Sequence, residues 1–146
     1  MFNKLHVCFQ IPSHIPLRLL SKNKKCYSRR MVDNGFCESV FIAGLRLPLT
    51  KLHRWLVDYL SVSLCQFYPN AWRIFINVEV LWRQISEGHR QLTLDEFFYC
   101  FKPQQIALLN GFYNIVTCKP MLKLVMDVLD SNHDWKGRYF FVQGVD

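Results

Sequence analysis

The chain has 146 residues, of which 51% are hydrophobic and 15% aromatic, and its formal net charge is +7 at pH 7. This length and hydrophobic content predict one globular domain with a single core, and they exclude a chain that is disordered throughout. The longest apolar run, residues 40–45, is far shorter than the ~18 residues of a membrane helix, and polar residues interrupt the N-terminal apolar stretch, so we expect neither a membrane helix nor a secretory signal.

The excess positive charge lies entirely in the first 32 residues, which contain no Asp or Glu. Residues 33–146 carry equal numbers of basic and acidic side chains, so the net charge predicts no nucleic-acid site there. We therefore expect residues 1–35 to be a basic, disordered leader and residues 36–146 to form a single globular domain. Three interpretations of the leader stay open: a nucleic-acid-binding arm, an organelle-targeting peptide, and translated sequence without a selected role ahead of Met31. The candidate nucleic-acid contacts in it are Lys22, Lys24, Lys25, Arg29 and Arg30.

Two helices are predicted in the middle of the chain, after a short segment at 40–47 whose β-branched and aromatic residues favour an extended conformation. Residues 49–60 place apolar side chains at helical spacing, which predicts a half-buried helix with Tyr59 on its apolar stripe. The stronger signal begins at Pro69 and ends near Gly88, a natural left-handed stop. Two apolar stripes, one of which includes Trp82, predict that this second helix is central and buried.

A third helix is predicted from the Thr93-x-x-Glu96 pattern of a capping box, and Pro103 is expected to close it after Phe101. Beyond Gly111, segments at 112–116, 122–128 and 138–142 are short and rich in aromatic and β-branched residues, which predicts a small antiparallel sheet. The segment 122–128 also fits a short helix. The sequence therefore predicts an α+β fold, helical over its N-terminal two-thirds, with a small antiparallel sheet near the C-terminus.

The sequence contains no pattern typical of a catalytic, metal or cofactor site. Its six cysteines lack the close pairing of zinc sites, which predicts reduced, mostly buried thiols. Glu96 is used by the capping box, Asp58 and Glu79 are expected on exposed helical edges, and His53 is expected on an exposed face. We therefore expect no catalytic residue, no bound metal and no cofactor.

Trp135, Lys136 and Arg138 form one further candidate for nucleic-acid binding, because an aromatic residue lies next to cations where a turn meets a strand. Strand alternation places Lys136 and Arg138 on one face, so a solvated face beside an aromatic anchor is the favoured interpretation.

Four signatures follow one another between Gly44 and Gly144: GLRLPL at 44–49, YPNAWR at 68–73, LTLDEF at 92–97 and WKGRYFFV at 135–142. In order and spacing the chain resembles the gypsy-type transposase domain found near the gag end of plant long-terminal-repeat retrotransposons and in host genes derived from them. The resemblance implies a retrotransposon-derived, gag-like origin and supplies no catalytic residues. We expect a non-enzymatic structural or protein-interaction module that binds a protein partner or a second copy of itself, in the nucleus or cytoplasm rather than an organelle. The alternative is nucleic-acid binding through the basic leader.

Overall fold

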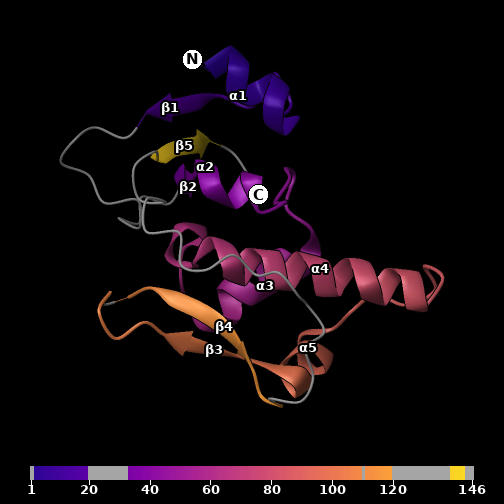
Figure 1. The fold of residues 1–146 in the computed structure, drawn as a ribbon. Coiled ribbons are helices and arrows are strands. Elements are labelled where there is room, and N and C mark those ends of the chain that lie inside the picture. The colour runs from indigo at the N-terminus through magenta and orange to yellow at the C-terminus, as the bar shows by residue number, and fades with distance from the viewer. Residues whose placement is uncertain (1, 20–32, 110, 120–138, 144–146) are drawn as a thin grey trace.

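The computed structural model describes residues 2–19, 33–109, 111–119 and 139–143 (Figure 1). Among these residues the α+β prediction is confirmed: helices dominate, and a small antiparallel sheet lies near the C-terminus. The elements in chain order are α1 (Phe2–Phe9), β1 (Leu17–Leu19), β2 (Asp33–Cys37), α2 (Glu38–Ile42), α3 (Lys51–Leu60), the 3-10 helix η1 (Leu64–Gln66), α4 (Pro69–Ile85), α5 (Leu94–Cys100), β3 (Phe101–Gln105), β4 (Tyr113–Thr117) and β5 (Tyr139–Gln143).

Two antiparallel sheets lie on opposite sides of α3 and α4 (Figure 1). One sheet has the strand order β1-β5-β2, in which Phe36 of β2 pairs with Phe140 of β5. The other consists of β3 and β4, in which Phe101 pairs with Thr117. The predicted strands at 112–116 and 138–142 are confirmed as β4 and β5, but they belong to different sheets, and the segment 122–128 lies outside the described residues.

The N-terminal residues do not match the expected disordered leader. Residues 2–9 form α1, Leu17–Leu19 pair with β5, and Ile11 and Ile15 are buried in the core. The Phe9 ring lies 5.3 Å from that of Phe41, which ties α1 to α2. Disorder was predicted from the composition of residues 1–35 as a whole, which the charged residues at 22–30 dominate. Residues 1–19 taken alone contain enough apolar side chains to pack against the core. The described part of residues 1–35 is therefore folded against the rest of the chain.

Two local predictions were wrong. The segment expected to be extended contains α2, because Val40 and Phe41 bury their side chains in the core and this packing outweighs their strand propensity. Pro103 does not close a helix: α5 ends at Cys100, and Pro103 lies within β3 opposite Ile115. A proline fits there because β4 is the one strand that β3 pairs with in the described residues, and an edge strand tolerates a missing N–H.

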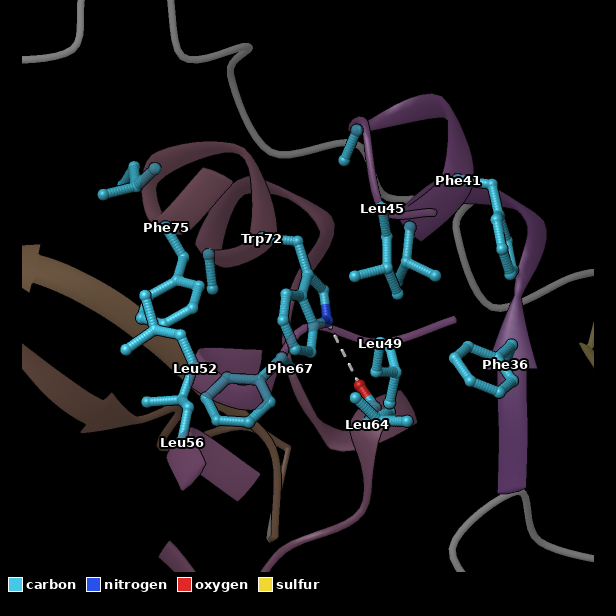
Figure 2. Packing of buried hydrophobic residues seen from close by; sticks show 14 of the residues in the cluster. Phe36, Phe41, Leu45, Leu49, Leu52, Leu56, Leu64, Phe67, Trp72 and Phe75 are labelled. Atoms are coloured by element: carbon cyan, nitrogen blue, oxygen red, sulfur yellow. Dashed lines mark hydrogen bonds between the residues drawn. The ribbon is translucent and has the colours of Figure 1, made fainter. Parts of the chain in front are cut away.

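The core is centred on Trp72 of α4, which is fully buried (Figure 2). Its indole N–H donates to the carbonyl oxygen of Leu64 at 3.3 Å, so the polar atom of this large side chain is satisfied. The rings of Phe67 and Phe75 meet it edge-on at centroid distances of 5.4 and 6.2 Å. The same apolar cluster also contains Phe36 of β2 and Phe41 of α2 (Figure 2).

Helix α4 is buried over only its first half. Its start at Pro69 is confirmed, and Gly88 just after it adopts the left-handed conformation (φ +78°). Its buried residues extend to Val78, whereas Trp82 is half-buried and Ile85 is 74% exposed. The second half projects beyond the neighbouring elements (Figure 1), so Trp82 is not the core residue that the stripe predicted.

Candidate functional site

A histidine and a glutamate connect α3 to α4. Thr50 caps α3 by accepting a hydrogen bond from the backbone N–H of His53 at 3.3 Å, while Nδ1 of His53 accepts the N–H of Thr50 at 3.4 Å. His53 therefore takes the place that Glu or Gln has in an ordinary capping box. Its Nε2 atom lies 3.1 Å from Oε2 of Glu79, with an alignment that departs from that of an ideal hydrogen bond.

The expectation that His53 and Glu79 are exposed was wrong. The side chain of His53 is only 6% exposed, and its ring lies against the rings of Trp72 and Phe75 at centroid distances of 5.7 and 5.6 Å. The contact with His53 lowers the pKa of Glu79 below its ordinary value, although burial acts in the opposite direction, and Arg83 at 3.7 Å lowers it further. Glu79 is therefore ionised at neutral pH, and both ring nitrogens of His53 are engaged by structural partners.

A pocket of about 310 Å³ opens beside Glu79, between the start of α3, the second half of α4 and the segment that follows α4. We call it the α3–α4 pocket. Two cation–aromatic contacts line it: the ammonium of Lys51 lies 4.7 Å from the ring centroid of Trp55, and the guanidinium of Arg90 lies 5.5 Å from that of Trp82. Arg83 completes its basic side chains. The pocket therefore combines aromatic walls with three cations around one ionised carboxylate.

Several aromatic side chains that are exposed or half-exposed lie on α3 and α5, beginning at the same pocket. Trp55 and Tyr59 are one turn apart on α3, and the ring of Tyr59 lies 5.1 Å from that of Phe98 on α5. Tyr99 follows Phe98 in the chain and is also exposed. Trp55, Tyr59 and Tyr99 are 43%, 68% and 70% exposed. We call Trp55, Tyr59, Phe98 and Tyr99 the aromatic strip. At its far end, the ammonium of Lys119 lies 3.9 Å from the ring centroid of Tyr99.

The residues predicted to bind nucleic acid cannot be compared with this site. Lys22, Lys24, Lys25, Arg29 and Arg30 lie outside the described residues, and so do Trp135, Lys136 and Arg138.

The predicted capping box of α5 is confirmed. Thr93 accepts the N–H of Glu96 at 3.2 Å, and the Glu96 carboxylate accepts the N–H of Thr93 at 3.0 Å. This second bond lowers the pKa of Glu96, which also pairs with Arg90 at 2.6 Å. Glu96 thereby positions a basic side chain of the α3–α4 pocket.

The cysteines that the structure describes differ in burial. Cys37 and Cys65 are buried, Cys100 is half-buried, and Cys8 and Cys118 are exposed, so the expectation of mostly buried thiols holds for some positions and fails for others. No group of three or more His, Cys, Asp or Glu side chains among the described residues is placed to hold a metal ion.

Comparison of the chain with protein-family models, with curated proteins and with solved structures gives no match. Within the ranges that the structure describes, no helix combines the length and the hydrophobicity needed to cross a bilayer.

Sequence reasoning missed the residues that form both features. Tyr59 was assigned to a buried stripe, whereas its side chain lies on the exposed flank of α3. A local signal did exist: Lys51, Trp55 and Tyr59 follow at intervals of four, which places one cation and two aromatics on one helix face. The residues that α4 and α5 add to the pocket and to the strip show no such spacing pattern, because their positions depend on how the helices pack.

Proposed function

We propose that this chain is a non-enzymatic protein-interaction module, of the retrotransposon-derived, gag-like origin that the sequence resemblance implies, and that the aromatic strip is its contact surface. The observation that carries this proposal is the exposure of Tyr59 and Tyr99 next to Trp55 and Phe98. Aromatic side chains bury a large area at low conformational cost, and Tyr and Trp are enriched at the centres of protein interfaces. Because these side chains lie on the two helices α3 and α5, they provide a rigid surface for a partner.

The arrangement of His53 and Glu79 supports a non-catalytic role. A general base needs a ring nitrogen free to take a proton from a substrate. Nδ1 of His53 already accepts the N–H of Thr50, and Nε2 faces Glu79 inside the core. The pair that most resembles a catalytic dyad therefore acts as a helix cap and as a link between two helices.

The test compares the proteins that are retained by the purified full-length wild type with those that are retained by a Tyr59→Ala/Tyr99→Ala variant. Both side chains are largely exposed, so their removal should leave thermal unfolding nearly unchanged while partner binding is lost. Leu108→Ala is the matched control, because Leu108 is 95% exposed and lies outside the strip. Proteins retained by wild type and by the Leu108 variant but released by the double variant would support the proposal. Identical retention by all three would refute it.

The competing hypothesis places the function in the basic segment, where Lys22, Lys24, Lys25, Arg29 and Arg30 would contact nucleic acid. Because residues 2–19 are part of the fold, replacing these five cations by Gln is a cleaner test than truncation. If these cations contact phosphates, the affinity of the wild type for duplex DNA should fall as the salt concentration rises. A plot of log affinity against log salt concentration should then have a slope no steeper than about −4 to −5. The five-Gln variant should then lose this binding while it still binds the protein partner.

A further inference from the structure

The α3–α4 pocket and the aromatic strip share Trp55, so one ligand can occupy both. We infer that the partner presents an acidic side chain beside its apolar residues, and that the carboxylate of this side chain binds in the α3–α4 pocket. This inference rests on the proposed function, because it names the chemistry of the partner that covers the strip.

The hydrogen-bonding balance of the pocket favours an anionic ligand. Its one carboxylate is already engaged: Oε2 of Glu79 faces His53 at 3.1 Å, and Oε1 faces Arg83 at 3.7 Å. Its donors are in excess. The ammonium of Lys51 lies 4.7 Å from the ring centroid of Trp55, and Arg83 and Arg90 supply further N–H donors. What the pocket lacks is an acceptor, which a carboxylate supplies.

The guanidinium of Arg90 is oriented so that it can bind the same carboxylate. One of its nitrogens pairs with Glu96 at 2.6 Å, and its guanidinium carbon lies 5.5 Å from the ring centroid of Trp82. A guanidinium has five N–H donors, so this ion pair orients the group and leaves other donors open to a second acceptor. The capping box of α5 in turn holds Glu96 in place. The position of Arg90 is thus set by an element that also carries the strip.

Charge distinguishes a single carboxylate from a polyanion. The carboxylates of Glu79 and Glu96 lie in and beside the pocket and would repel a run of phosphates. Residues 33–146 carry no net positive charge, so the counterion release that stabilises nucleic-acid complexes is weak here. A single acidic side chain carries one charge, so it meets a smaller repulsion, which Lys51 offsets, and Lys119 at the far end of the strip complements a second acid.

The test selects peptides from a random dodecapeptide display library against the full-length protein, with Tyr59→Ala as the counter-selection. We expect enriched sequences in which Asp or Glu accompanies aromatic or aliphatic residues. Replacing that acid by Asn or Gln, or making the Lys51→Gln variant, should each weaken binding about three- to tenfold. Lys102→Gln, which removes an exposed cation of β3 outside the pocket, should change nothing. A Lys51→Glu variant should regain affinity for a peptide whose acid is replaced by Lys.

The outcomes separate this inference from the proposed function. The inference would be overturned if the peptides whose binding requires Tyr59 carried no acidic residue, or if they bound the Lys51→Gln variant as tightly as the wild type. Either result would leave the proposed interaction surface intact. A selection that enriches no Tyr59-dependent peptide would refute both. Lys51-dependent binding of a labelled oligothymidylate in place of the peptides would identify a nucleic acid as the ligand and overturn the inference.

Discussion

Replacing Trp72 by alanine should bring the protein close to its unfolding threshold. Trp72 is fully buried at the centre of the core, between α3, η1 and the first half of α4 (Figure 2). Removing such a side chain typically costs about 3–5 kcal/mol, because the lost transfer energy is joined by the energy of the cavity that remains. A domain of this size has a total free energy of unfolding of about 5–15 kcal/mol.

The hydrogen bond of Trp72 makes a second variant informative. In Trp72→Ala the buried carbonyl of Leu64 loses the donor that reaches it at 3.3 Å. Trp72→Phe keeps an aromatic ring against Phe67 and Phe75 and removes this one bond, while the carbonyl still accepts the backbone N–H of Phe67 at 3.4 Å, so the lost bond should cost about 1 kcal/mol. The phenylalanine variant should therefore be intermediate between the wild type and the alanine variant.

Urea unfolding followed by far-UV circular dichroism measures these differences. Trp82→Ala is the matched comparison, because it removes the same side chain from the same helix at a half-buried position and should cost only about 1–2 kcal/mol. If Trp82→Ala destabilised the protein as much as Trp72→Ala, the second half of α4 would belong to the core and the position of the α3–α4 pocket would be wrong.

Three further predictions concern the local contacts. Glu79→Gln should lower the free energy of unfolding at pH 7 by about 1 kcal/mol. Because the pKa of Glu79 is lowered below its ordinary value of 4.5, this stabilisation is present above that pH and is lost as the pH falls through the lower folded value. The urea midpoints of the two proteins should therefore converge as the pH is lowered below 4.5, and a constant gap would contradict the assignment. Thr93→Ala should cost about 1 kcal/mol through loss of the cap, whereas Thr93→Ser should be nearly neutral in the same urea assay; equal losses would mean that the cap is unimportant. Deleting residues 1–19 should lower the thermal midpoint, because β5 loses a neighbour and Ile11 and Ile15 leave the core; an unchanged midpoint would show that this segment does not pack as described.

Features set by neighbouring residues could be predicted from the sequence. The capping box at Thr93 depends on a side chain three positions away, and the start of α4 depends on the fixed φ of Pro69. The cap at Thr50 depends on the same spacing, but it uses the imidazole of His53, which lies outside the usual Glu or Gln pattern.

Features set by packing between distant segments could not be predicted. The partner of His53 is Glu79, on another helix, and no pattern within either helix indicates their contact. Strand propensity predicted β5 but not that it pairs with β1 and β2, because propensity describes the conformation that a residue favours and not the strand with which it pairs. The α3–α4 pocket is lined by residues of two helices and of the segment after α4. Which side chains line it could therefore not be predicted from the sequence, for the same reason.

The position of β5 between β1 and β2 has a consequence for synthesis of the protein. The central strand of the sheet is made about 100 residues after both of its neighbours, so β1 and β2 leave the ribosome without a partner. At typical rates of elongation this interval lasts roughly 5–20 s. During it, two strands expose unpaired backbone groups, which favours pairing between nascent chains or shielding by a chaperone. Products that terminate before Tyr139 keep this exposed state permanently, so early termination should yield aggregating chains rather than a smaller folded protein.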